Sequence, residues 1–261
     1  MELSFINYIH NEKKLTFKIQ EGKIIGLTGI EPQGIAKLIT LENLSSGQII
    51  SKSTKITKEN INEFRKNIVY VTDDIKTSQS NTYNIIIEYI KRNNLELKEP
   101  TKKIISSLKI VGLRQEILGR DFYTLSTSEK KLLQLAISLL SNPEIIIIDE
   151  PFKVFDKSKE KQLIMLYQRL RDQLKKTIIF VSDDENMLYK YTDEMFFEKN
   201  GEIIISGKTE EVYLNVDSLN KNKFSIPEII RFTYMAQKNK KVKIIYHKDI
   251  RDIIKDIYKH I

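Results

Sequence analysis

The sequence contains no cysteine and no tryptophan, and its three histidines (His10, His247 and His260) are far apart along the chain. The absence of cysteine excludes disulfides, thiolate metal ligands and a cysteine nucleophile, and it fits a reducing compartment. Three scattered imidazoles are too few for a histidine-bound metal cluster. We therefore expect no metal held by sulfur or imidazole.

Long apolar runs are also absent. The longest, "IIIID" at 145–149, ends in a carboxylate, whereas a transmembrane helix needs roughly 18 apolar residues. The first residues, "MELSFINYIHNEKK", contain no basic segment followed by a long apolar one, so no secretory signal is expected. These features predict a protein that stays in the cytoplasm.

The charge balance favours the basic side: 43 lysines and arginines against 35 acids give a net charge of +8. Such a balance would suit nucleic acid or an anionic membrane surface, or it could reflect only a composition rich in Lys, Asn and Ile. No basic run is interleaved with aromatic residues that could stack on bases. We therefore do not favour a nucleic-acid partner.

The order of predicted elements divides the 261 residues into three parts. Short strand-like runs fill residues 3–71, with one short helix after Gly34, and helical patterns fill about 73–140. Apolar strands then return, and a basic, helical segment follows from about residue 212. Apolar runs buried on both faces and separated by helices predict an α/β fold with a mostly parallel sheet.

One strand carries a pair of acids. The sequence "EIIIIDEP" (144–151) places Asp149 and Glu150 at the carboxyl end of a buried strand, where open α/β sheets present ligand sites. In nucleotide hydrolases the first acid of such a pair holds Mg²⁺ and the second polarises the attacking water. The alternative is a strand that merely ends in solvated acids.

The order of motifs resembles the ATP-binding subunit of an ABC transporter. The motifs are a glycine loop near residue 30, "LSTSE" at 125–129, "IIIIDEP" about twenty residues later and "TIIFVSDD" at 177–184. The resemblance implies a P-loop nucleotide-binding domain over residues 1–211, with a mixed sheet core and a helical subdomain at about 73–140.

The C-terminal part narrows the resemblance. Residues 207–240, "GKTEEVYLNVDSLNKNKFSIPEIIRFTYMAQKNK", resemble the C-terminal region of the ATPase subunits of energy-coupling factor (ECF) transporters. In that family a similar segment takes part in pairing two ATPases. The resemblance therefore implies that residues 212–261 form a small helical assembly segment.

The glycine loop departs from the family pattern. A Walker A loop reads G-x-x-x-x-G-K-[ST], and its lysine and hydroxyl reach the phosphates and Mg²⁺. Gly29 and Gly34 keep the glycine spacing, but Ile35 stands at the lysine position and Ala36 at the hydroxyl position. Lys37 lies two residues later, a rotation of roughly 200° on a helix, so it could substitute only if the loop changes register.

Two further positions, at which the family contacts the metal ion and the γ-phosphate, are altered. The glutamine that links Mg²⁺ to the membrane-coupling region falls on Thr72 or Asp73. The switch histidine is replaced by Asp183, whose charge would repel a γ-phosphate. Asp156 matches the D-loop aspartate, although "KVF" precedes it.

The signature is altered in part. Ser126 matches, whereas Thr127 and Ser128 stand where the family has two glycines. Tyr8, near the first strand, is a candidate for stacking on adenine, as an aromatic does in the family. The alternative is an ordinary strand aromatic packed on the sheet.

These residues predict a divergent ATP-binding subunit of an ABC or ECF-type transporter, with weak or absent ATPase activity and with ATP and Mg²⁺ doubtful in its own site. Its expected partners are a second ABC ATPase subunit and an integral membrane coupling protein, which would place it on the inner face of the cell membrane. Two alternatives stay open. One is a regulatory or scaffold protein on an ABC core, and the other is an ABC protein linked to nucleic acid.

Overall fold

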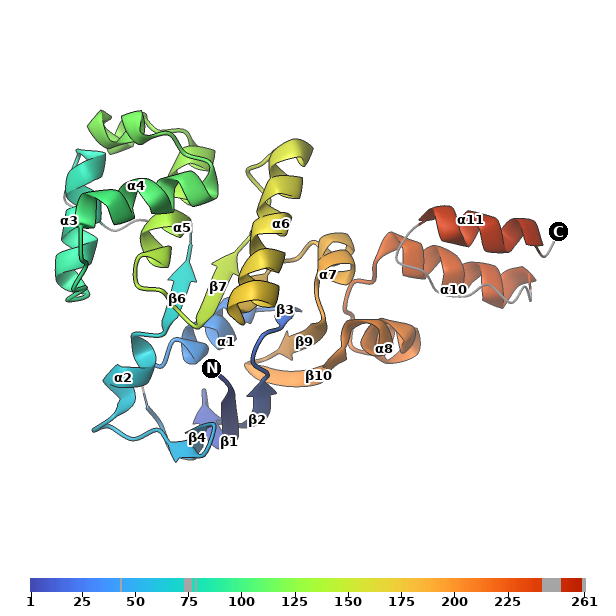
Figure 1. Cartoon of the computed structure of the whole chain (residues 1–261). Coiled ribbons are helices and arrows are strands. Elements are labelled where there is room, and N and C mark those ends of the chain that lie inside the picture. The colour runs from blue at the N-terminus through green and yellow to red at the C-terminus, as the bar shows by residue number, and fades with distance from the viewer. Residues whose placement is uncertain (43, 73–76, 78, 241–249, 260–261) are drawn as a thin grey trace.

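The computed structural model describes residues 1–42, 44–72, 77, 79–240 and 250–259. Two β-sheets form its centre (Figure 1). The smaller sheet is antiparallel, with the order β2-β1-β4-β5. Its strands are β1 (Leu3–His10), β2 (Lys13–Ile19), β4 (Gln48–Ser51) and β5 (Thr54–Lys55).

The larger sheet has six strands in the order β10-β9-β3-β8-β7-β6. All neighbours pair in parallel except the antiparallel edge strand β10. The predicted mostly parallel sheet is therefore confirmed. The strands are β3 (Ile24–Gly29), β6 (Ile68–Val71), β7 (Ile145–Asp149), β8 (Thr177–Val181), β9 (Glu194–Lys199) and β10 (Glu202–Lys208).

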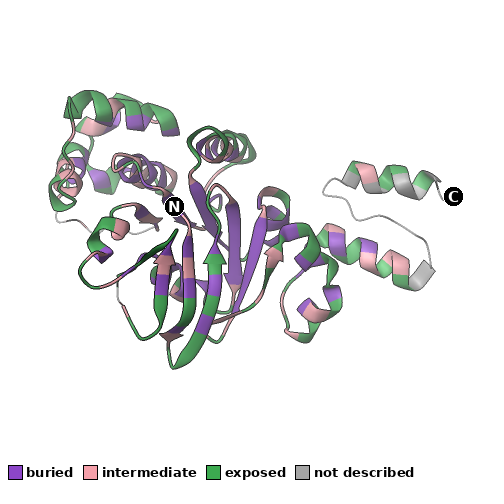
Figure 2. Ribbon diagram, turned by 60° about the horizontal axis from the view of Figure 1, so that its bottom comes forward, coloured by how far each residue is buried: buried purple, intermediate pink, exposed green. Residues whose placement is uncertain are grey.

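Both faces of the parallel sheet are covered, which explains why its strands are apolar throughout. In β7, Ile145 and Ile147 pack into a cluster with the antiparallel sheet and α1 (Pro32–Ile39). Ile146 and Ile148 point the opposite way, into a cluster built mainly from helices. Figure 2 shows the buried strands in purple between these two layers.

The helices form three groups. α1 contacts β3, β6, β8 and β9 of the larger sheet, and α2 (Ile61–Arg65) follows the small sheet along the chain. α3, α4 and α5 gather in a separate lobe, coloured teal to yellow-green in Figure 1. This lobe confirms the helical pattern expected within residues 73–140. The remaining helices follow β7. Their bounds are α3 (Thr82–Arg92), α4 (Pro100–Val111), α5 (Thr127–Leu139), α6 (Lys157–Leu174), α7 (Glu185–Tyr191), α8 (Thr209–Leu214), α9 (Val216–Lys221), α10 (Glu228–Lys240) and α11 (Ile250–Lys259).

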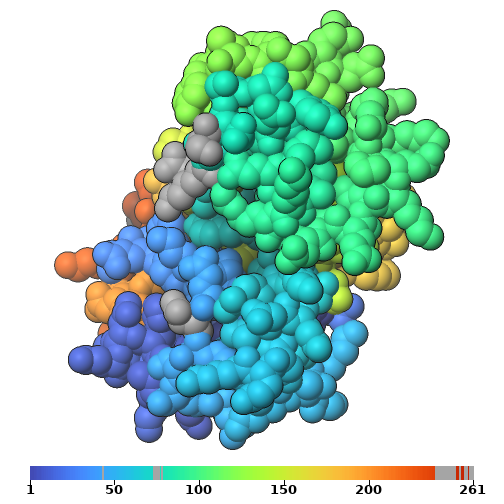
Figure 3. Space-filling model, turned by 90° about the vertical axis from the view of Figure 1, so that its left-hand side faces the viewer, coloured from blue at the N-terminus to red at the C-terminus, as the bar shows by residue number. Residues whose placement is uncertain are grey.

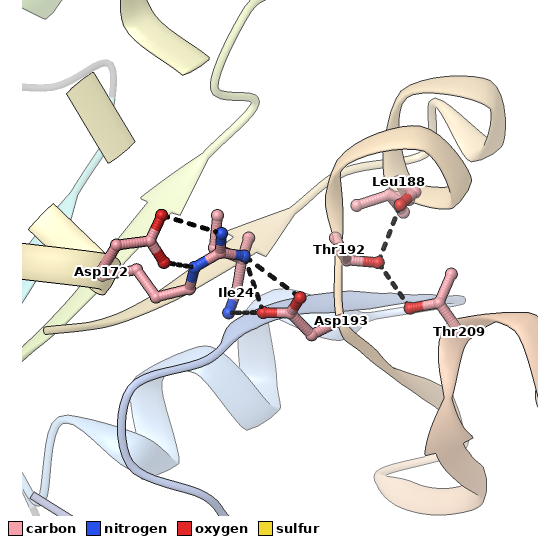
Figure 4. A network of polar contacts seen from close by, with 7 residues as sticks. Ile24, Asp172, Leu188, Thr192, Asp193 and Thr209 are labelled. Atoms are coloured by element: carbon pink, nitrogen blue, oxygen red, sulfur yellow. Dashed lines mark hydrogen bonds and ion pairs between the residues drawn. The ribbon is translucent and has the colours of Figure 1, made fainter. Parts of the chain in front are cut away.

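A polar network fixes the start of β3 (Figure 4). The Asp193 carboxylate accepts the Ile24 N–H at 2.8 Å and lies 3.1 Å from the Arg171 guanidinium on α6. The adjacent Thr192 hydroxyl lies 2.9 Å from the Thr209 hydroxyl at the start of α8. The strand that leads to the glycine loop and the beginning of the C-terminal segment are thus anchored side by side.

The C-terminal segment divides into a buried and a projecting part. α8 and α9 contribute Tyr213 and Leu219 to the larger core cluster. α10 begins against the core, where Ile230 is buried in the same cluster. Its end and α11 lie side by side and project from the rest of the molecule (Figures 1 and 2). α10 carries exposed apolar side chains, with Phe232 53% and Met235 48% exposed. Within the described residues, no helix combines the length and apolar character needed to cross a membrane.

Candidate functional site

The glycine loop starts with a close approach of two strands. Gly29 has φ 143°, and a Cβ on it would lie 2.0 Å from the carbonyl oxygen of Glu198 on β9. Only glycine fits such a position. The same carbonyl accepts the N–H of Ile30 at 3.3 Å. The loop is therefore held against β9 from its first residue.

Helix α1 begins at Pro32, and the expected start after Gly34 was wrong. Proline has its φ fixed near the helical value and lacks an N–H, so it suits the first helical turn. The N–H of Gly34 donates to the carbonyl of Glu31 at 3.0 Å and so belongs to this turn. Ile35 and Ala36 are fully buried in the apolar cluster beneath. The phosphate-binding positions of the motif have become helix and core.

A buried carboxylate occupies the loop. Glu198 has no exposed side-chain surface. Its Oε2 accepts the N–H of Glu31 at 2.6 Å, and its Oε1 accepts the N–H of Gly201 at 2.6 Å. Sequence reasoning missed this residue, because it follows the loop by 167 residues and lies inside a strand. The one signal was an acid after the apolar run "EMFF".

Three of the predicted residues meet in one cleft. Lys37 is exposed on α1 and lines this cleft with Thr72 and Asp149. The cleft has a volume of about 1180 Å³ and separates the strands from the helical lobe. Figure 3 shows the hollow between the lower, blue part and the upper, green part of the molecule. Asp73, the alternative to Thr72, lies outside the described residues.

Asp149, the predicted metal ligand, is bonded within the protein. The Tyr70 hydroxyl forms a hydrogen bond with it, and burial, together with the Asp149 charge, raises the pKa of Tyr70. The Lys131 ammonium, on a side chain that is 5% exposed, donates to the Asp149 carbonyl. The end of β7 is thus tied to β6 and α5.

Glu150, the second acid of the predicted pair, does not line the cleft that contains Asp149. Its φ of 45° is left-handed, an unusual conformation for a side chain of this size. Its Oε2 accepts from the Ser182 hydroxyl at 2.9 Å, and burial raises the pKa of its carboxyl. Glu150 and Asp183 line a second cleft of about 500 Å³. The predicted pair of acids therefore faces two different clefts.

Glu185, two residues after Asp183 in the sequence, is a further buried carboxyl. Glu185, in the first turn of α7, accepts hydrogen bonds from the Thr28 hydroxyl at 3.2 Å and from the Tyr213 hydroxyl. Its side chain is 8% exposed, and burial raises its pKa to about 7. Glu185 joins the residue before Gly29, the switch region and α8.

The signature residues cap helix α5 at the surface. The Ser126 hydroxyl accepts the Glu129 N–H at 3.2 Å, and the Glu129 carboxylate accepts the Ser126 N–H at 2.9 Å. This reciprocal pair is a capping box. Ser126 and Thr127 are exposed and Ser128 is half-buried. The start of α5 therefore remains open to contact by another chain.

Two other predicted site residues have structural partners. Asp156 caps α6 by accepting the Lys159 N–H at 2.8 Å. Tyr8 is 2% exposed, and its hydroxyl accepts the Ser45 N–H at 2.8 Å. Its ring packs edge-on against Phe5 at 5.7 Å. This is the arrangement of a core aromatic, the alternative considered from the sequence.

The site does not fit ATP and Mg²⁺ as a hydrolytic P-loop would hold them. The lysine and hydroxyl positions are apolar and buried, the Glu31 N–H is bonded to Glu198, and Asp149 is bonded to Tyr70. Within the described residues, no group of three or more His, Cys, Asp or Glu side chains is placed to hold a metal ion. We derive no hydrolytic step at this loop.

The fold itself defines a class of protein, the ATP-binding cassettes. The structure of cbiO1 from Clostridium perfringens, described as part of the ABC transporter complex cbiONQ, superposes with a TM-score of 0.68 at 22% identity, over 89% of this chain and 98% of that one. A nucleotide-free ATP-binding cassette from an ABC transporter superposes with a TM-score of 0.69 at 20% identity, over 85% and 98%. The expected fold is confirmed.

Sequence comparison gives the family. The ABC transporter family model matches residues 13–153, so the chain belongs to the ABC transporter family. The phosphonates import ATP-binding protein PhnC of Fusobacterium nucleatum is 29% identical over 80% of this chain and 90% of its own length. The energy-coupling factor transporter ATP-binding protein EcfA3 of Oenococcus oeni is 27% identical over 95% and 89%. ECF ATPases are thus one of several kinds of relative.

Proposed function

We propose that this chain is a divergent ATP-binding subunit of a membrane transporter, which hydrolyses little or no ATP in its own site. The observation that carries the proposal is the burial of Ile35 and Ala36 in the core. An ABC ATPase needs a cation and a hydroxyl at these positions to stabilise the phosphates and the metal ion. An isoleucine and an alanine supply neither.

The proposal includes two partners, a second ABC ATPase subunit with an intact loop and an integral membrane protein that it drives. In ABC dimers each nucleotide lies between one chain's Walker motifs and the other chain's signature. Ser126 and Thr127 are exposed at the start of α5, where a hydroxyl and helix N–H groups can meet a phosphate held by a partner. The chain would then complete its partner's site.

We further propose that the transporter to which this subunit belongs is of the ECF type. The support for this type is the helical segment after β10 and the similarity to the relatives EcfA2 and EcfA3. The exposed apolar side chains of α10, Phe232 and Met235, suit a role in assembly, because isolated apolar helix faces are normally covered.

The test compares two substitutions in the assembled complex. Ser126→Arg adds bulk and charge where the partner's nucleotide would bind, so we expect ATP turnover to fall by about a hundredfold. Glu150→Gln lies in the site without a phosphate-binding lysine, and we expect turnover to stay within about twofold. Ser53→Arg, on the exposed turn after β4, is the matched control for adding an arginine.

The opposite ranking would contradict the proposal. If Glu150→Gln abolished turnover and Ser126→Arg left it intact, this chain's own site would perform the chemistry. Ordinary ATPase activity of the purified chain, lost in Glu150→Gln, would lead to the same conclusion.

A further inference from the structure

We propose that Glu198 is the resident anion of the glycine loop: its carboxylate takes the N–H that a nucleotide phosphate would need, so this side chain decides that the loop accepts no phosphate. The inference rests on the proposed function, in which the chain does not use its own loop for hydrolysis. It adds a specific residue and a specific contact to that function.

Both oxygens of the carboxylate are hydrogen-bonded within the protein. Glu198 is completely buried, and burying a carboxylate is costly unless it is hydrogen-bonded. Each of its oxygens receives one backbone N–H at 2.6 Å, from Glu31 in the loop and from Gly201 in the turn between β9 and β10. Hydrogen bonds to an ionised acceptor are about twice as strong as neutral ones. Glu198 therefore joins the loop firmly to the neighbouring turn.

The backbone of the same residue holds the loop as well. Its carbonyl accepts the Ile30 N–H at 3.3 Å, and Gly29 packs directly against it. Three successive loop residues, 29 to 31, are thus attached to one residue of β9. Lifting the loop toward a ligand would leave Oε2 of Glu198 buried without its partner, the Glu31 N–H, which costs more than the bond itself contributes.

The rest of the loop offers little in exchange. Pro32 has no N–H, and the Gly34 N–H is bonded to the Glu31 carbonyl at 3.0 Å. A phosphate entering this space would meet the charge of Glu198 at short range in a medium of low dielectric constant, where like charges repel strongly. Both the donors and the charge therefore oppose a phosphate.

The first experiment uses pyrophosphate as the probe on the full chain. We expect millimolar pyrophosphate to leave the melting temperature of the wild type unchanged. Glu198→Ala removes the resident carboxylate, so the variant should melt at a lower temperature and recover in pyrophosphate or formate. Its affinity for pyrophosphate should be at least about tenfold higher than that of the wild type. Glu194→Ala removes another buried carboxylate of β9 and is the matched control, with no recovery expected.

A second variant covers the case in which Glu198→Ala does not fold. Glu198→Gln keeps the shape but turns one acceptor oxygen into a donor. Hydrogen exchange of the Glu31 and Gly201 amides should then accelerate by about tenfold or more. Unchanged exchange in this variant, or equal pyrophosphate affinity of Glu198→Ala and the wild type, would overturn the inference. ATP turnover by the wild-type chain would overturn the proposed function and the inference together, whereas the two results above overturn the inference alone, so the two failures are distinguishable.

Discussion

The buried carboxyl of Glu185 should make the stability of the protein depend on pH. Burial, against only two hydroxyl donors, raises its pKa from the ordinary 4.5 to about 7. The nearby charges of Asp183 and Asp184 act in the same direction. A raised carboxyl pKa means that the folded state binds the proton more tightly than the unfolded state does. The contribution of Glu185 to stability is therefore complete below pH 4.5 and is lost as the pH rises through about 7.

The size of the effect follows from the shift. Each pKa unit corresponds to about 1.4 kcal/mol, so the free energy of unfolding should fall by about 3 kcal/mol over this range through Glu185 alone. Glu185→Gln is neutral at every pH and can keep hydrogen bonds to the hydroxyls of Thr28 and Tyr213. We expect the stability of this variant, relative to the wild type, to rise by about 3 kcal/mol between pH 4.5 and 7.5.

The assay is urea unfolding of both proteins at intervals across this pH range. Taking the difference between them cancels the titration of other groups, such as Glu150. Glu211→Gln, at a residue whose side chain is 65% exposed, is the matched control and should shift stability by no more than about 0.5 kcal/mol. Parallel pH profiles of the wild type and Glu185→Gln would refute the reasoning, because a group ionised at neutral pH in both states contributes no such slope.

Two further predictions concern the loop and the C-terminal helices. Gly29→Ala should destabilise the protein by more than about 3 kcal/mol, because the new Cβ would overlap the Glu198 carbonyl. Gly119→Ala, where no atom lies within 4 Å of the added carbon, should change stability by less than about 0.5 kcal/mol in the same thermal melts. Deleting residues 235–261 removes α11 and the end of α10, with the exposed Met235, but keeps Ile226 and Ile230, which lie in the core cluster. We expect a folded chain with at least about tenfold weaker affinity for its partner ATPase by calorimetry, and unchanged affinity would contradict the assembly role.

The sequence was sufficient for the fold because its signals are local. Isoleucine runs ending in acids, helical periodicity and turn residues predicted the parallel sheet and the helical lobe. The replacement of the phosphate-binding groups at Ile35 and Ala36 was also readable directly. Asp149 and Glu150 were predicted to act as a pair, yet the structure places them in two different clefts. Glu150 also has a left-handed backbone with φ 45°, a feature that local apolar patterns do not predict.

Long-range polar contacts were equally beyond a reading of one sequence. Glu198 meets Glu31 across 167 residues, and Glu185 meets Thr28 across 157. Glu198 follows the apolar residues "MFF", which indicated a buried acid, whereas Glu185 stands in the polar stretch "SDDEN" and gave no such signal. The hydrogen-bond partner of Glu198 depends on which strands become neighbours in the sheet. The pairing of β3 with β9 is a long-range feature that one sequence does not reveal.

The burial of Ile35 also bears on how such a chain can evolve. A lysine introduced at this position would place an ammonium group in a fully buried apolar cluster, at a cost of several kcal/mol. A serine or threonine in place of the fully buried Ala36 would add bulk and an unpaired hydroxyl to the same cluster. Each step toward a working phosphate loop is therefore unfavourable while Glu198 and Pro32 stay in place. Under the proposed function, a transporter that contains this chain would therefore depend on the catalysis of the partner subunit.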